Sequence, residues 1–219
     1  MATPRRRRTR RTRTALLQQR VKQERESVYR QAINEAAERV FAEKGTDRSR
    51  MGEIAAEAGI SLGTLYGVID GKESLFFGIH KLRMREFLDC IRAARDAQDD
   101  ILASHLAVLR LGAQYFLERP DFLRMCCRDG YGWASRFPAS KRGSDLWNEA
   151  ASIPRELFER GIAEGIYVED DPELLVRKML ALKQAELTHW VDHGLETPHG
   201  VVLDRLESQF LRAFCTRDP

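Results

Sequence analysis

Residues 53–66, EIAAEAGISLGTLY, have the pattern of two short helices joined by a tight turn. Ala55 is small, as a position where two helices cross closely requires, and Gly59 four residues later can adopt the left-handed conformation of the turn. Leu65 places an apolar group on the inner side of the second helix and so locks the pair at a steep angle. The stretch therefore predicts a helix-turn-helix whose second helix is capped by Ser61.

Helical periodicity continues on both sides of this stretch. Apolar residues at spacings of three and four predict a helix from near Ser27 to Gly45, then a short helix with Ser49 as its N-cap. Pro154 is expected to kink a later helix or to mark its start. The other predicted helices cover residues 61–68, 72–91, 101–118, a segment beginning at Pro120, 145–164, 171–193 and 201–214, with a loop over 129–144. Because no convincing strand-like alternation occurs, we predict an all-α fold of about nine helices.

Charge is distributed unevenly along the chain. Residues 1–30 carry eleven Lys or Arg against two Glu, a net charge of +9, which leaves −6 for the rest of a chain whose total is +3. Seven arginines within residues 5–13 repel one another and bury nothing, so we expect residues 1–26 to form a disordered basic arm. Guanidinium groups pair bidentately with phosphates and base edges, although a solubilising tail or an address signal would have the same composition. A helix-turn-helix domain over 27–75 and a helical domain over 76–219 follow.

Composition excludes several classes of protein. Apolar residues make up 43% and charged residues 32% of 219 residues, which indicates a soluble globular chain. No run approaches eighteen apolar residues, so no membrane partner is expected, and the basic start lacks the apolar stretch of an export signal. Four cysteines without a C-x-x-C pair favour a reduced, cytoplasmic compartment over a disulfide framework.

Residues 53–66, followed by KESL at 72–75 and preceded by the helix end at 36–45, resemble the tetracycline-repressor (TetR) family. The matching motif covers residues 30–76, about a fifth of the chain. The rest of the sequence is similar to the family only in layout: a Gly-rich segment at 161–165 and two long terminal helices. The resemblance implies a ligand-responsive transcriptional regulator, a repressor located at the nucleoid, that binds a palindromic operator in double-stranded DNA as a homodimer.

The helix-turn-helix pattern, the basic arm and the resemblance together indicate which residues meet DNA. The second helix of the unit would lie in the major groove with its first residues at the base edges, and the basic arm would enter the minor groove. The full set of predicted contacts is Arg5, Arg6, Arg7, Arg8, Ser49, Arg50, Ser61, Leu62, Gly63, Thr64, Tyr66, Gly67 and Lys72. The family usually has larger polar or aromatic residues where this chain has Gly67 and Val68. Direct base readout should therefore be sparse, and we expect the arm to compensate through phosphate contacts.

For the second domain, the resemblance implies a cavity for a small-molecule effector and a dimer built from the last two helices. Aromatic residues and one cation are candidates for the cavity: Tyr115, Phe116, Arg124, Tyr131, Trp133 and Trp147. The apolar stripes of the last two helices are candidates for the dimer interface: Met179, Leu187, Trp190, Leu203, Leu206, Phe210 and Phe214. Burial in the monomer core would explain either set equally simply. Lys183 and Gln184 interrupt the penultimate stripe, and we expect them on an exposed face.

Other functions receive weaker support. His189 and His193 are four residues apart and could share a metal, but solvated histidines near a helix end explain them better, and we predict no metal or cofactor. Cys126 and Cys127 could sense redox state, although buried inert thiols are the simpler interpretation. The sequence contains no G-x-S-x-G, phosphate-binding glycine loop or clear Cys-His arrangement, so neither an enzyme nor a helical protein without DNA binding is favoured.

Overall fold

The structure, a computed structural model, describes the backbone of residues 5–129 and 144–216 and the side chains of residues 18–128 and 146–216. Within these ranges the chain forms nine helices and no strand, which confirms the all-α prediction. The helices are α1 (Arg5–Lys44), α2 (Met51–Glu57), α3 (Leu62–Tyr66), α4 (Lys72–Asp96), α5 (Ile101–Leu117), α6 (Pro120–Asp129), α7 (Ser144–Ala163), α8 (Pro172–Asp192) and α9 (His199–Phe214).

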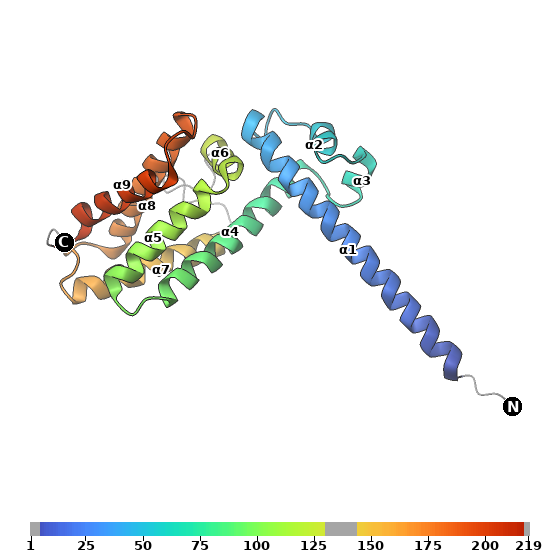
Figure 1. Ribbon diagram of the computed structural model, residues 1–219, viewed down its shortest axis with the longest axis horizontal. Coiled ribbons are helices and arrows are strands. Elements are labelled where there is room, and N and C mark those ends of the chain that lie inside the picture. The colour runs from blue at the N-terminus through green and yellow to red at the C-terminus, as the bar shows by residue number, and fades with distance from the viewer. Residues whose placement is uncertain (1–4, 130–143, 217–219) are drawn as a thin grey trace.

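The first helix is longer than the sequence predicts. It begins at Arg5 rather than near Ser27, so the disordered arm expected over residues 1–26 is replaced by helix from residue 5 onward. The extension projects away from the rest of the molecule (Figure 1). Its described part is rich in Gln, Arg, Lys and Glu, which favour helix intrinsically, and Lys22 pairs with Glu26 one turn later at 3.8 Å. This helix propensity outweighs the charge repulsion on which the predicted disorder rests.

The helix-turn-helix forms as predicted. Gly59 has φ +67° at the turn between α2 and α3, a conformation that favours glycine, and Ala55 is buried at the crossing. Ile54 and Leu65 are fully buried and belong to the same core as Phe41 of α1. The C-terminal part of α1 therefore supports the short α2 and α3, which are too small to bury a core alone.

Helix α4 leads from this unit into a bundle with α5, α7, α8 and α9, and α6 packs against both α1 and α8 (Figure 1). Pro154 lies inside α7 rather than at its start. The loop predicted over 129–144 falls largely on residues 130–143, outside the described part of the chain. Helices α4 and α6 thus join the helix-turn-helix unit to the bundle.

The residues predicted to form a dimer interface lie inside the monomer. All seven are at most 6% exposed, and Leu187 and Phe210 are completely buried. Phe210 stacks on Phe158 of α7 at 6.0 Å, and His105 of α5 lies 4.8 Å from the same ring. The prediction is wrong for these residues because the stripe of α9 packs against α5 and α8 of its own chain, and the stripe of α8 packs against α7 and α9.

Candidate nucleic-acid interface

Helix α3 presents its outer face to solvent. Ser61 caps the helix: its Oγ accepts a hydrogen bond from the Thr64 amide at 3.0 Å and lies 2.8 Å from the Thr64 hydroxyl. Leu65 points inward and is 0% exposed, whereas Leu62 is 45% and Tyr66 53% exposed. An exposed leucine and tyrosine on a helix that its own chain supports from behind form a surface open to a partner.

The other residues predicted on this helix are also accessible. Gly63 and Gly67 are exposed, and Thr64 is partly buried. Gly67 ends α3 with ordinary helical angles, so its lack of a side chain, rather than any unusual backbone, distinguishes the position. A partner can therefore contact the backbone at the end of α3 directly.

The segment before α2 differs from the prediction. Arg50, not Ser49, is the N-cap of α2, and its amide donates to the Glu53 carboxylate at 3.1 Å. Ser49 is 4% exposed, and its hydroxyl donates to the carbonyl oxygen of Gly45 at 2.6 Å. The Ser49 hydroxyl thus holds the end of α1 and does not face solvent, whereas Arg50 is exposed.

Lys72, the first residue of α4, connects that helix to the α1–α2 loop. Its Nζ donates to the carbonyl oxygens of Asp47 at 3.2 Å and Ser49 at 3.1 Å. The ammonium group therefore fixes the α1–α2 loop beside the start of α4. A lysine ammonium has three donors, so one remains for an anion at this helix N-terminus.

The extension of α1 and the end of α3 enclose a groove of about 540 Å³. Its lining combines both elements: Gln18, Val21, Lys22, Arg25, Glu26, Tyr29, Thr64, Gly67 and Val68. Arg30 anchors the two walls by donating to the carbonyl oxygen of Val68 at 3.2 Å. The predicted contacts do not include Lys22 and Arg25, which belong to the predicted arm. Their i, i+3 spacing places both on one face of the extended helix.

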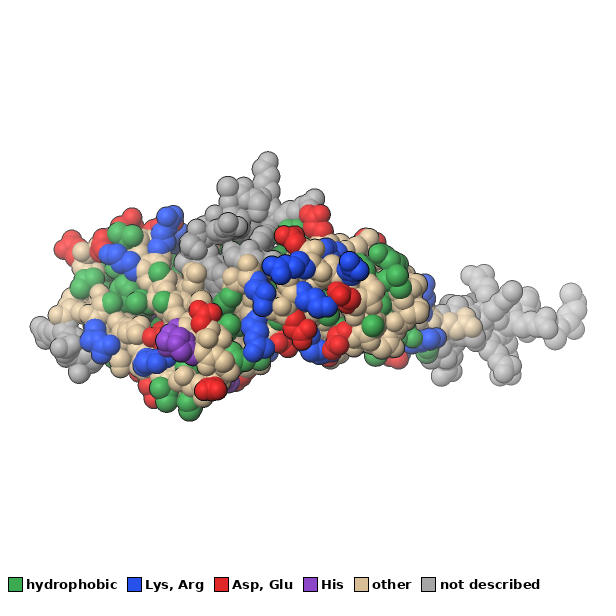
Figure 2. Space-filling model, turned by 90° about the horizontal axis from the view of Figure 1, so that it is seen from above, with side chains coloured by type: hydrophobic (Ala, Val, Ile, Leu, Met, Phe, Trp, Pro, Cys, Tyr) green, Lys and Arg blue, Asp and Glu red, His purple; other side chains and the backbone are tan. Residues whose placement is uncertain are grey.

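Cations and anions alternate around α1 and α2. Lys44 pairs with Glu53 at 2.8 Å and Arg39 with Glu57 at 2.6 Å. The hydrogen bond from Lys44 lowers the pKa of Glu53. Figure 2 shows Lys and Arg side chains mixed with Asp and Glu over this half of the molecule. Positive and negative groups are therefore interleaved on this surface rather than separated into patches of one sign.

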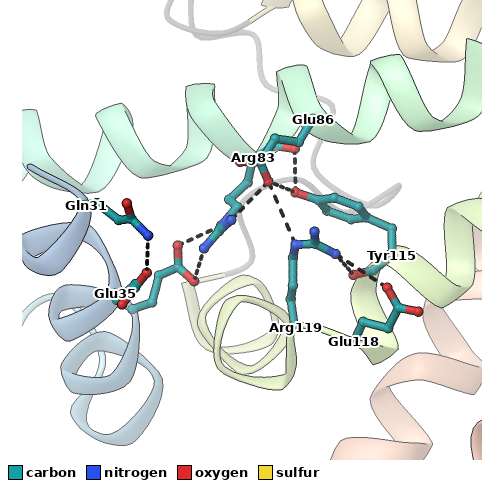
Figure 3. A network of polar contacts seen from close by, with 8 residues as sticks. Gln31, Glu35, Arg83, Glu86, Tyr115, Glu118 and Arg119 are labelled. Atoms are coloured by element: carbon teal, nitrogen blue, oxygen red, sulfur yellow. Dashed lines mark hydrogen bonds and ion pairs between the residues drawn. The ribbon is translucent and has the colours of Figure 1, made fainter. Parts of the chain in front are cut away.

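A polar network connects the helix-turn-helix unit to the bundle (Figure 3). Arg83 of α4 binds both carboxylate oxygens of Glu38 of α1, at 2.8 and 3.1 Å, and Glu86 at 2.9 Å. Tyr115 of α5 donates to Glu86 at 2.8 Å, and the guanidinium of Arg119 lies 3.9 Å from the centre of the Tyr115 ring. Helices α1, α4 and α5 are thereby joined by charge-assisted hydrogen bonds.

Burial sets the electrostatics of this network. Burial raises the pKa of Glu38, and Arg83 opposes that rise. The pKa of Arg83 is raised by its two carboxylate partners, against the effect of burial. Burial also raises the pKa of Tyr115, so its hydroxyl remains a donor. The bidentate geometry keeps Arg83 and Glu38 as an ion pair at neutral pH.

The predicted cavity residues separate in the structure. Trp147 lines a cavity of about 30 Å³ between α4, α5, α7 and α8. Tyr115 belongs to the polar network, Phe116 is buried in the core, and Arg124 pairs with Asp121 on α6 at 3.5 Å. Tyr131 and Trp133 lie outside the described residues. Lys183, expected on an exposed face, is 9% exposed and lines the cavity, and Gln184 beside it is partly buried.

The metal and thiol alternatives gain no support. The rings of His189 and His193, near the end of α8, have centroids 3.9 Å apart and are tilted by 37°. No group of three or more potential ligands for a metal occurs in the described ranges. Burial raises the pKa of the Cys127 thiol, which disfavours the reactive thiolate, and Cys126 is buried. Over the described residues, no helix is long and apolar enough to cross a membrane.

Comparisons with known proteins agree with this geometry. Residues 33–79 match the family model of bacterial regulatory proteins, tetR family. The chain is 30% identical over 89 residues to the HTH-type transcriptional regulator SAB2452 of Staphylococcus aureus, and 31% identical over 93 residues to the fatty acid metabolism regulator protein of Bacillus subtilis. These matches cover 41% and 42% of this chain and 46% of each relative, so the chain spans about half the length of the curated relatives it matches.

Solved structures resemble the chain over most of its length. The ketosteroid transcriptional regulator KstR2 of Mycobacterium tuberculosis superposes with a TM-score of 0.72 at 19% identity, covering 86% of this chain and 95% of that one. FadR of Bacillus subtilis in complex with stearoyl-CoA superposes with a TM-score of 0.69 at 17% identity, covering 82% and 96%. At these identities the likeness establishes the fold alone.

Proposed function

The chain carries the domain of the tetR family of bacterial regulatory proteins, and we propose that it is a transcriptional regulator that binds double-stranded DNA through α3. The observation that carries the proposal is the division of α3 into a buried side, Leu65, and an outer side, Leu62 and Tyr66, on a supported helix. A helix held in this way is suited to enter the major groove. We propose no enzymatic role.

The exposed residues suggest how DNA is contacted. We propose that Ser61, Leu62, Gly63 and Thr64 lie at the base edges and that the Tyr66 hydroxyl meets a phosphate. Because α3 offers few hydrogen-bonding side chains, backbone contacts must supply much of the affinity.

Phosphate contacts would come from the elements around α3. We propose Arg50 and Lys72, at the starts of α2 and α4, and Lys22 and Arg25, in the wall of the groove that α1 supplies. Arg5, Arg6, Arg7 and Arg8 would extend these contacts along the DNA, as a helix rather than as a disordered arm. Ser49 would act indirectly, by holding the α1–α2 loop.

We propose that two copies bind a palindromic operator, because a two-fold dimer places two recognition helices in successive major grooves. The seven buried residues of α8 and α9 cannot form that interface. The outer face of α8 is the better candidate: Leu174 is 42% exposed, and the small residues Ala181 and Ala185 are uncovered and permit close helix packing.

We propose that a small-molecule effector bound in the bundle releases the protein from DNA, so that the regulator is a repressor. The similarity to the fatty acid metabolism regulator and to FadR in complex with stearoyl-CoA supports the proposal that this chain binds a small-molecule effector. The Arg83–Glu38 pair offers a physical route from the bundle to α1. A regulator of this kind acts on chromosomal DNA, in the cytoplasm at the nucleoid.

Selection of bound fragments from random DNA at one stated salt concentration tests the proposal. We expect an enriched inverted repeat whose half-sites are about one helical turn apart, or a multiple of that spacing. Enrichment of a single half-site without symmetry would contradict the proposed dimer but not the proposed DNA binding. Failure to enrich any sequence would overturn the proposed function.

A further inference from the structure

Lys183 of α8 points into the apolar cavity between α4, α5, α7 and α8. Its Nζ lies 5.0 Å from the centre of the Phe87 ring and 5.6 Å from that of Phe116. The other residues around the cavity are Ile91, Val108, Leu109, Trp147, Ala150, Ala151, Pro154, Met179 and Leu180. Lys183 is therefore the single charged group among the described lining residues.

The described residues around Lys183 do not neutralise its charge. Within residues 18–128 and 146–216, no carboxylate or carbonyl oxygen accepts a hydrogen bond from the Lys183 ammonium. Burial lowers its pKa to about 8, so the ammonium form still dominates at pH 7. The two aromatic faces compensate part of the lost hydration. A cation that is nine-tenths buried without an anionic partner destabilises the folded state. A ligand that supplies an anion would remove this destabilisation when it binds.

We propose that this cavity binds the effector and that the effector is an anion with an apolar body, whose carboxylate or similar group pairs with Lys183. The inference rests on the proposed function, because it names the effector class of the same regulator. An anion supplies the hydrogen-bond acceptors that Lys183 lacks, and an apolar body matches the remaining wall. A neutral apolar molecule would leave the ammonium group unpaired.

The size of the cavity indicates how binding affects the fold. About 30 Å³ holds roughly one water molecule, so an effector must bind a conformation in which the cavity is wider. Phe87 in the cavity wall lies one turn from Arg83 on α4, and its ring is 5.7 Å from that of Tyr115. Widening at Phe87 thus acts on the Arg83–Glu38 pair that joins α4 to α1. The effector shifts the population toward the wider state by its preference for that state.

The test compares decanoate with 1-decanol by calorimetric titration of the purified protein without DNA. The two probes share an apolar chain, and decanoate alone carries a charge. We expect wild-type protein to bind decanoate at pH 7 and to bind decanol at least about 10-fold more weakly, since a hydrogen bond to a charged group is worth this much. The variant K183M should lose about 10- to 100-fold in decanoate affinity and little in decanol affinity.

A control variant and a pH titration test whether the charge of Lys183 itself is responsible. K178M removes a cation of the same helix, partly exposed and paired with Asp170 at 2.6 Å, and should leave decanoate binding unchanged. The lining contributed by α4, α5 and α7 has no titratable side chain, and Glu186 of α8 pairs with Arg205 of α9. Above pH 8, decanoate affinity of the wild type should therefore fall about 10-fold per pH unit, and K183M should show no such fall.

Several results would overturn the inference: no decanoate binding by the wild type, equal affinity for both probes, or K183M that is folded by circular dichroism and binds decanoate as the wild type does. Because the titration contains no DNA, its outcome is independent of operator binding. Addition of decanoate to the DNA complex should then weaken binding of the wild type but not of K183M.

Discussion

Two buried histidines predict a steep loss of stability in mild acid. His80 lies against Phe76 and Phe122, with ring centroids 4.6 and 5.4 Å apart, and His105 is fully buried among Phe158, Tyr167 and Phe210. Burial lowers the pKa of His80 to about 4 and that of His105 to about 3, from 6.5. Both are therefore neutral in the folded chain at pH values where the unfolded chain protonates them.

The direction of the effect follows from proton binding. Between pH 6.5 and about 4, the unfolded state binds more protons, so the free energy of unfolding falls as pH falls. Each histidine contributes a slope of about 1.4 kcal/mol per pH unit in this window. The two together should cost about 4–5 kcal/mol between pH 6.5 and 4.5, a large part of a typical domain stability of about 5–15 kcal/mol. Above pH 7 the two side chains should cause no pH dependence.

Urea unfolding followed by circular dichroism at pH 7.5, 6.5, 5.5 and 4.5 measures this slope. The variant H80L should reduce it by about 1.4 kcal/mol per pH unit, because one neutral buried base is removed. Comparison with the wild type cancels the contribution of the carboxylates. An H80L slope equal to that of the wild type would refute the reasoning.

Three further outcomes are expected. Deletion of residues 1–13 should weaken DNA binding and reduce the slope of log K against log salt concentration by several units. The slope falls by about 0.9 for each phosphate that the protein no longer neutralises. An unchanged slope would exclude these residues from the interface. R83M should destabilise the protein by about 3 kcal/mol in chemical denaturation, because Glu38 is left buried without its partner, and E38L added to R83M should recover part of that loss. L65A should cost about 2–5 kcal/mol, since it opens a cavity in a fully buried site, and a cost near zero would mean that α3 is not packed as described.

The sequence predicts the helix-turn-helix well because its signals are local. Gly59 takes the left-handed turn, Ser61 caps α3 and Leu65 is buried, and each of these follows from the chemistry of one residue and its near neighbours. Ser49 is the instructive exception. A serine before a short helix suggests a cap, but its hydroxyl bonds back to Gly45, a choice that depends on how α1 ends.

Longer-range packing accounts for what the sequence does not predict. The stripe of α9 reveals an apolar face but not which helix covers it, and the covering helices belong to the same chain. Lys183 interrupts an apolar stripe, which usually marks an exposed position; here the stripe faces a cavity that four helices create together. The extension of α1 differs from the prediction because the helix propensity of its residues outweighs the repulsion between arginines.

The central claim is that the outer face of α3 contacts DNA, and one pair of variants tests it most directly. Leu62 of α3 is 45% exposed and Leu111 of α5 is 39% exposed, so glutamate at either position should leave stability within about 0.5 kcal/mol. In fluorescence anisotropy with a selected operator, L62E should abolish binding through charge repulsion and L111E should bind as the wild type does. Equal affinity of L62E and L111E for the operator would contradict the account.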